Sequence, residues 1–199
     1  ERRGVILGEL DIKGVEAHAG GAYLEGHSAN KELAHKVLKL YSFNDYERRI
    51  YYNAAPISGG RPNGVVSGDA HMGFCCAGLP TEASFAEAEA NIESLAVHNE
   101  DPACRTTVSH KVLFPALEKS EMSHKAFIIA KKAGELLGIE MEELSEPTAT
   151  DANWFWHYGI PAVDAFGPIQ AGMHTTEEKV YIPSIKEKTA LFALMLAMM

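Results

Sequence analysis

The fold of this chain is decided by the stretch VILGELDIK, which runs from Val5 to Lys13. Ile6, Leu10 and Ile12 recur in it with a period of two and share that parity with Gly8. A period of two places alternate side chains on one face of a strand, while the polar residues between them face water. The stretch therefore predicts a half-buried β-strand near the beginning of the chain.

The elements that follow this strand have the order helix, strand, strand, helix, strand. The helices are predicted from apolar residues spaced three and four apart, with Ser28 as the N-cap of the first. This order is typical of the ferredoxin-like fold, an α+β arrangement in which two helices cover one face of a four-stranded antiparallel sheet. We expect this domain to cover residues 4–116. The predicted ranges are a helix over 28–43, strands over 49–57 and 65–76, a helix that begins at 80, and a strand over 104–113.

Residues 117–199 change to an α/β pattern. Two strands within about 85 residues make a poor sheet on their own, so this domain is expected to be incomplete. The start of the chain at Glu1, without Met, fits that expectation. The predictions are a long helix that ends at Gly138, a strand over 140–144, an aromatic helix over 151–158, an apolar strand over 160–166, a loop over 167–179, and a last helix with Ser184 and Glu187 as its capping box.

Composition excludes several classes of protein. The chain is 46% hydrophobic and 23% charged, which is ordinary for a globular protein. Its 18 basic and 27 acidic residues give a net charge of −9, which disfavours nucleic acid as a partner. The longest apolar stretch, 190–199, falls far short of the roughly 20 residues that cross a bilayer, so no membrane partner is expected. The odd number of cysteines, 3, disfavours a disulfide framework and indicates the reducing cytoplasm.

Among the 9 histidines, His18 and His174 stand out by their positions. His18 ends a strand and enters a glycine loop, where its ring either contacts a ligand or only caps local carbonyls, and the residues leave both roles open. His174 lies in the loop after a predicted apolar strand, a common location of ligand sites, which favours a metal or substrate role. Five of the other histidines, which lie on or at the ends of predicted helices and strands, are expected to be surface or structural residues: His35, His71, His98, His110 and His124.

A complete hydrolytic metal site is not visible in the sequence. Such a zinc site needs three protein ligands plus a water molecule. The chain contains no His-x-x-x-His, no Cys-x-x-Cys, no nucleophile elbow and no phosphate-binding loop. Spacing alone therefore assigns no reaction.

Four short motifs nevertheless occur in a recognisable order. They resemble those of the co-catalytic zinc peptidases and deacylases, which include glutamate carboxypeptidase, acetylornithine deacetylase and succinyl-diaminopimelate desuccinylase. The resemblance spans nearly the whole chain, and the order of the motifs makes it more specific than any one of them. The motifs are GVEAHAG over 14–20, ISGGRPN over 57–63, TDA over 150–152, and the segment from Gly159 through His174 to Glu178.

The resemblance implies a division of labour between the two domains. Residues 4–116 would form a lid that pairs with its twin in a homodimer, and residues 117–199 would be the C-terminal segment of an α/β zinc-exopeptidase domain whose N-terminal segment is absent. It further implies that the intact site holds two zinc ions, or other divalent metals. The implied roles are a metal ligand for His174, polarisation of the scissile carbonyl for His18, assistance from the same side for Asn63, and lining of the substrate pocket for Thr150 and Asp151.

The implied activity is metal-dependent hydrolysis of an amide bond in a small peptide or an N-acyl amino acid. The general base and the remaining ligands would lie upstream of Glu1, so the chain alone is expected to dimerise but not to hydrolyse. Two family arginines that bind substrate carboxylates are not matched, because Cys75 and residues 112–114 stand in their places.

The alternative is a non-catalytic dimerisation or binding module built on the ferredoxin-like sheet. The loop that holds His174 beside Glu178 favours the enzyme.

Overall fold

The computed structural model describes all residues from Glu1 to Met199. The chain forms two compact units. We call residues 2–118 and 146–149 the N-terminal unit, and residue 1 with 119–145 and 150–199 the C-terminal unit.

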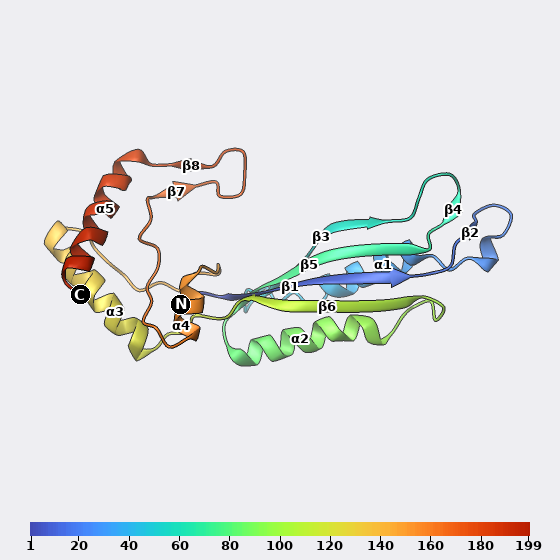
Figure 1. The fold of residues 1–199 in the computed structure, drawn as a ribbon, viewed down its shortest axis with the longest axis horizontal. Coiled ribbons are helices and arrows are strands. Elements are labelled where there is room, and N and C mark those ends of the chain that lie inside the picture. The colour runs from blue at the N-terminus through green and yellow to red at the C-terminus, as the bar shows by residue number, and fades with distance from the viewer. The chain divides into compact units, whose positions relative to one another are not determined.

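The N-terminal unit has the ferredoxin-like fold that the sequence predicts. Four strands form an antiparallel sheet in the order β3-β5-β1-β6, and two helices pack on it (Figure 1). A pair of two-residue strands, β2 and β4, forms a separate ribbon. The elements are β1 (Gly4–Lys13), β2 (Ala17–His18), the 3-10 turn η1 (Tyr23–Glu25), α1 (Ala29–Tyr41), β3 (Tyr51–Gly59), β4 (Val65–Val66), β5 (Asp69–Leu79), α2 (Glu82–Val97) and β6 (Arg105–Phe114).

The core of this unit lies between the sheet and the two helices. Ile6, Leu10 and Ile12 of β1 are each 0% exposed, which confirms the face assigned from their spacing. Gly8 shares that face. A Cβ there would lie 2.2 Å from the ring of Phe74 on the neighbouring strand, so this position has no room for a side chain. Burying each large aliphatic side chain contributes about 1.5–3 kcal/mol, so the alternation is enough to fix which face of β1 is buried.

Each of the two helices begins directly after a residue whose side chain caps its first turn. The Ser28 hydroxyl accepts the backbone N–H of Lys31 at 3.2 Å, as predicted for the N-cap of α1. Thr81 caps α2 in a reciprocal capping box with Ser84. Each cap satisfies N–H groups that the first turn of a helix cannot pair internally.

The prediction of one strand over 65–76 is wrong. The structure has two strands, β4 and β5, separated at Ser67 and Gly68. The carbonyl of Gly68 accepts the N–H of Gly14 at 2.8 Å, and that of Ser67 accepts the N–H of Ala29, also at 2.8 Å. Because the backbone at the break bonds to other segments, the chain changes partners there and the short β4 can pair with β2.

The C-terminal unit consists of helices and one short hairpin. Its long helix ends at Gly138, whose φ of 69° is the left-handed conformation that favours glycine, as predicted. A small apolar core joins this helix to the last one through Ala130, Ala133, Leu191 and Met195. No helix in the chain has the length and apolar character needed to cross a bilayer. The elements are α3 (Glu121–Leu137), α4 (Ala152–His157), β7 (Gln170–Ala171), β8 (Lys179–Val180) and α5 (Ile182–Ala197).

Four predictions for this unit are wrong. Residues 140–144 and 160–166 are not strands, because neither segment has a neighbouring strand to satisfy its backbone groups. The predicted loop over 167–179 instead contains β7 and the start of β8, which pair with each other. Ser184 does not cap the last helix, since α5 begins at Ile182. The Ser184 hydroxyl, inside the first turn, donates to the Tyr181 carbonyl at 2.6 Å.

Candidate functional site

The β2–β4 ribbon at one end of the N-terminal unit carries the first candidate residue, His18. The segment that leads into the ribbon begins at Gly14, where a Cβ would lie 2.1 Å from the carbonyl oxygen of His27, so glycine is required. His18 pairs with Val65 across the ribbon, and its side chain is exposed. The fold therefore holds the imidazole on a bonded backbone while leaving it open to a ligand.

The ring of His18 has a defined hydrogen-bonding pattern. The backbone N–H groups of Gly20 and Gly21 donate to its Nδ1 at 3.1 and 3.0 Å. A nitrogen that accepts hydrogen bonds carries no proton, so the proton of the neutral ring is on Nε2. The ring thus bonds its own glycine loop, but through backbone N–H groups and not through the local carbonyls expected from the sequence. It also leaves a free Nε2–H donor for a ligand.

This tautomer can be tested directly. With the imidazole ring in its neutral form, we expect long-range ¹⁵N–¹H spectra to show Nδ1 of His18 as the unprotonated nitrogen, because two backbone N–H groups donate to it. His35, which is exposed on α1, is the matched control and should show both tautomers in exchange. A His18 ring protonated on Nδ1 would contradict the loop geometry.

Asn63 lies in the loop that leads into β4, the strand that pairs with the strand of His18. The N–H of Ala19 donates to the carbonyl of Gly64 at 2.7 Å, which joins the two loops directly. Asn63 is exposed and has a φ of 78°, a conformation that Asn tolerates better than most residues. The structure thus brings together the loops of His18 and Asn63, which are far apart in the sequence.

One ion pair at this ribbon was not anticipated from the sequence. Arg61 donates to Glu16 at 2.5 Å, and both side chains are exposed. Glu16 lies directly before β2, and Arg61 lies in the loop between β3 and β4, so this ion pair joins the two segments that lead into the ribbon. No local signal could have paired two residues that are so distant along the chain.

Thr150 and Asp151 lie at the start of α4 in the C-terminal unit. The N–H of Thr150 donates to the Oδ1 of Asn153 at 3.1 Å, and Asn153 is 0% exposed. The Thr150 hydroxyl is buried and makes no hydrogen bond. Asp151 is exposed and makes no side-chain cap to the helix, so its carboxylate is available to a ligand.

His174 lies in the turn between β7 and β8. It is exposed and has a φ of 62°. Gly172 at the same turn has a φ of 71°, and a Cβ there would lie 2.8 Å from the carbonyl of Glu177, so the turn requires glycine. The Thr175 hydroxyl closes the turn by donating to the Gly172 carbonyl at 2.7 Å. The loop is therefore shaped by its own hydrogen bonds and presents the imidazole to solvent.

The residues of this chain do not form a metal site by themselves. No three side chains among its His, Cys, Asp and Glu residues lie together in a way that could hold an ion. A single exposed imidazole supplies one of the three or more protein ligands that a zinc site needs. His174 fits the chemistry of one ligand, and the rest of a donor set is not among the residues around it.

The cysteines are suited to packing rather than to nucleophilic chemistry. All of them are free thiols: Cys75, Cys76 and Cys104. Burial raises the pKa of the Cys76 thiol to about 12. A thiol held protonated in this way is a poor nucleophile, because the thiolate is the reactive form.

Comparison with known proteins places this fold in a family. Residues 1–103 match the model of the M20 peptidase dimerisation domain. A search of curated proteins found no match.

Several solved structures share the fold. The aminopeptidase PepT from Bacillus cereus is 23% identical, with a TM-score of 0.75 over 98% of this chain and 51% of that one. A tripeptidase from Staphylococcus aureus is 18% identical, with a TM-score of 0.79 over 99% and 52%. The YxeP protein of Bacillus subtilis, described as a dinuclear metal-binding peptidase of the M20 family, is 14% identical, with a TM-score of 0.66 over 99% and 50%. The chain spans about half the length of these structures.

Since the family match covers more than half of its 199 residues, the chain belongs to the M20 peptidase family, whose dimerisation domain forms its N-terminal unit.

Proposed function

We propose that this chain supplies the dimerisation domain and the C-terminal catalytic segment of a metal-dependent hydrolase that cleaves an amide bond in a small peptide or an N-acyl amino acid. The observation that carries the proposal is the matched dimerisation domain joined to a second unit, with both covered by similar folds in peptidase structures. The intact protein would be a homodimer and would work in the cytoplasm, where its thiols stay reduced.

The N-terminal unit would contribute a hydrogen-bond donor to the reaction. His18 presents its Nε2–H to solvent because its Nδ1 is occupied by the glycine loop. A donor of this kind stabilises the negative charge that develops on the carbonyl oxygen of an amide as it is attacked. Asn63, on the adjoining loop, would bind the substrate from the same side.

The C-terminal unit would contribute to substrate and metal binding. The exposed Asp151 and the neighbouring Thr150 would line the substrate pocket, with the Thr150 hydroxyl turning outward from its present unbonded position. His174 would be one ligand of a metal site for two zinc ions, and acidic ligands from outside this chain would complete it. A bound metal would supply activation of water.

One observation favours the alternative of a non-catalytic binding module, namely that the chain holds no group of three metal-binding side chains. The two functions differ in what precedes Glu1 in the gene. For the hydrolase we expect an upstream His-x-Asp and a Glu-Glu pair, each following a predicted strand. If neither is encoded there, the binding module becomes the better explanation.

Zinc titration of the chain as it stands tests the role of His174. We expect at most weak binding at one site, because a single imidazole contributes one ligand, and we expect His174→Ala to reduce it further. Isothermal titration calorimetry is the measurement, and His35→Ala, an exposed histidine on α1, is the matched control. Two-site binding at micromolar affinity or tighter would show that the chain holds a complete metal site and would refute the proposed division of ligands.

Activity of the protein encoded by the complete gene tests the role of His18. Loss of one oxyanion donor costs about 2.7–4 kcal/mol, or a factor of 10²–10³ in kcat. We therefore expect His18→Ala to lower kcat for amide hydrolysis by that factor, while His35→Ala leaves it unchanged. An unaltered kcat in His18→Ala would remove His18 from the reaction.

A further inference from the structure

The segment over residues 27–30, at the start of α1, is bonded to both ends of the β2–β4 ribbon. We call it the anchor segment. The backbone N–H of His27 donates to the carbonyl of Val15 at 2.9 Å, and the N–H of Val15 donates back to the His27 carbonyl at 2.8 Å. The N–H of Ala29 donates to the carbonyl of Ser67 at 2.8 Å. Because Val15 comes shortly before β2 and Ser67 directly follows β4, one short segment holds the ribbon at both ends.

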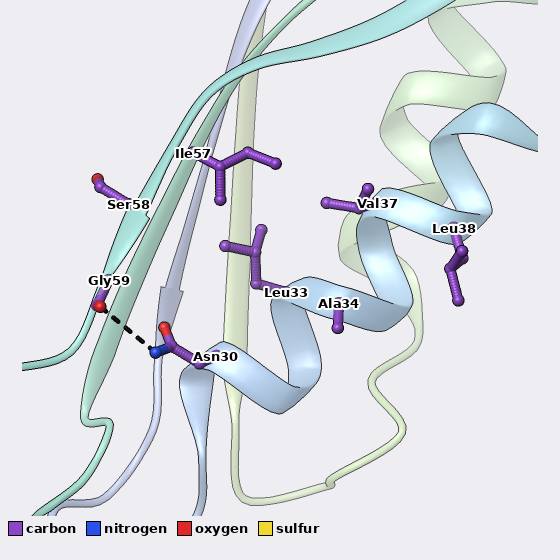
Figure 2. Close-up of a pocket in the computed structure, with 8 residues that line it drawn as sticks. All are labelled: Asn30, Leu33, Ala34, Val37, Leu38, Ile57, Ser58 and Gly59. Carbon is purple, nitrogen blue, oxygen red and sulfur yellow. Dashed lines mark hydrogen bonds between the residues drawn. The ribbon is translucent and has the colours of Figure 1, made fainter.

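The anchor segment also holds the loop that contains Asn63. The side-chain amide of Asn30 donates to the carbonyl of Gly59 at 3.3 Å, and both residues line the pocket between α1 and β3 (Figure 2). Gly59 is the last residue of β3, and the chain runs from it through the loop of Asn63 into β4. The loops of His18 and Asn63 therefore both depend on the position of the anchor segment.

The side chain of His27 ties the anchor segment to the loop between α2 and β6. Its Nδ1 lies 3.0 and 2.9 Å from the two carboxylate oxygens of Asp101. A carboxylate only accepts hydrogen bonds, so the ring carries a proton on Nδ1. The hydrogen bond from His27, together with the N–H of Ala103, holds the pKa of Asp101 below its ordinary value. The acceptor of the His27 proton is therefore a charged carboxylate.

Asp101 is itself held by buried groups of the N-terminal unit. Its N–H donates to the Oε2 of Glu32 at 3.0 Å, and the N–H of Glu100 donates to the Oε1 at 3.2 Å. Glu32 lies on α1, is 1% exposed and forms an ion pair with the buried Lys36. Buried polar networks that are hydrogen-bonded in this way rigidify the structure around them. The ring of His27 thus bonds to an acceptor that the core keeps in place.

The ribbon has little else to fix it. β2 and β4 have two residues each, and Val66 alone among these four is buried. The loop over 19–26, which joins β2 to the anchor segment, contains no buried residue. Two paired strands without a core of their own are marginally stable in water. The position of His18 therefore depends on the bonds at the base of the ribbon.

We propose that His27 is a positioning residue for the reaction: its hydrogen bond to Asp101 fixes the anchor segment, which in turn fixes the ribbon that presents the Nε2–H of His18. The inference rests on the proposed function, in which His18 donates to the carbonyl oxygen under attack. His27 acts only through His18. A shift of about 1 Å in a group that acts on the reacting atoms can cost about 10²-fold in rate, so a loose ribbon would be felt in the reaction.

Hydrogen exchange of the chain tests whether His27 fixes the ribbon. We expect His27→Leu, which cannot donate, to speed exchange of the Val15 and Ala19 amides by about 10-fold or more, the scale of one hydrogen bond to a charged group. The amide of Leu10, in the middle of β1, should keep its wild-type rate, because both neighbouring strands pair with it.

Two further variants sharpen this measurement. His27→Asn should restore most of the protection, because the amide nitrogen of Asn stands at the same position along the side chain as Nδ1 and can donate to Asp101. His71→Leu is the matched control, since the Nδ1 of His71 also lies 3.0 Å from a carboxylate, that of Asp11. The backbones of His71 and Asp11 are already paired in the sheet, so this variant should leave exchange in the ribbon unchanged.

Activity of the protein encoded by the complete gene tests whether His27 acts through His18. We expect His27→Leu to lower kcat by about 10- to 100-fold with little change in KM, because the donor it positions acts in the transition state. Added to His18→Ala, it should cause no further loss, since the group it positions is already gone. His27→Asn should recover most of kcat, and His71→Leu should keep the wild-type value.

The outcomes separate this inference from the proposed function. Wild-type exchange at Val15 and Ala19 in His27→Leu would overturn the inference, and so would equal acceleration at Leu10, which would show a general loss of stability. Losses that multiply in the double variant would also overturn it, because His27 would then act independently of His18. If His18→Ala keeps its kcat, the proposed role of His18 fails, while faster ribbon exchange in His27→Leu would still establish that His27 fixes the ribbon.

Discussion

Replacing Glu32 with alanine should lower the free energy of unfolding of the N-terminal unit by about 3–5 kcal/mol. This is the usual cost of removing one partner of a buried ion pair. Glu32 lies on α1 and is 1% exposed. Its carboxylate accepts the N–H groups of Glu100 and Asp101 at 3.2 and 3.0 Å and lies 3.1 Å from the Nζ of Lys36. Alanine would leave the Lys36 ammonium, itself 5% exposed, buried without its anion.

Urea unfolding followed by circular dichroism measures this loss. Glu47→Ala removes an exposed carboxylate of the same unit and should change the free energy of unfolding by less than about 0.5 kcal/mol. The double variant Glu32→Gln with Lys36→Met removes both charges and should recover part of the loss, since the uncompensated ammonium is gone. If the double variant is less stable than Glu32→Ala, the unpaired charge is not the cause.

The same carboxylate should make stability depend on pH in acid. Burial raises the pKa of Glu32, but the N–H of Asp101, the Lys36 side chain and the N–H of Glu100 outweigh it, and the net pKa lies below the ordinary 4.5. The unfolded chain then takes up a proton at a higher pH than the native one. The stabilisation is complete above pH 4.5 and is lost as the pH falls through the lower native pKa. We expect Glu32→Gln to flatten the acid limb of the stability curve, and an unchanged limb would assign it to other groups.

Local signals explain why the N-terminal unit could be predicted from its sequence. The alternation in β1 and the caps at Ser28 and Thr81 depend on residues within a few positions of each other. Side-chain periodicity and capping act over that same range, so the sequence contains the information that decides them. The order of elements then leaves few topologies to choose from.

The C-terminal unit shows where such reasoning fails. Residues 160–166 form an apolar run, and an apolar run predicts a strand whether or not a neighbour exists to pair with it. In the structure Val163 and Phe166 pack on the core shared by α3 and α5 instead. The identity of a strand depends on distant partners, and those partners cannot be deduced from the run itself.

Some features of the candidate site could likewise be predicted from the sequence, and others could not. The positions of His18 at the end of a strand and of His174 in a loop could be deduced from flanking patterns, and the structure places His18 at the end of β2 and His174 in a turn, both of them exposed. The tautomer of His18 could not, because it depends on how two glycine N–H groups are oriented. Glu32 gave no signal, because an acidic residue on a helix reads as solvent-facing unless its partners are known, and Glu100 and Asp101 are far away in the sequence.

Substitution of Gly78 with alanine should destabilise the N-terminal unit by about 2–5 kcal/mol, the sum of about 1–2 for an L residue held at positive φ and about 1–3 for forced overpacking. Gly78 lies in β5 with a φ of 90°. A Cβ there would lie 2.0 Å from the carbonyl oxygen of Arg49 and 3.1 Å from its carbon. Both contacts are with backbone, so no side chain can rotate away and the chain itself must shift.

Gly64→Ala is the control that separates the two contributions. Gly64 also has a positive φ, 68°, but a Cβ added there would have no atom within 4 Å, so only the backbone strain of about 1–2 kcal/mol applies. Urea unfolding of both variants gives the difference, which reports the close approach of Arg49 alone. Equal losses would mean that the Arg49 carbonyl moves aside at little cost. A larger loss in Gly78→Ala would show that β5 and the segment directly before β3 must approach closely at this point.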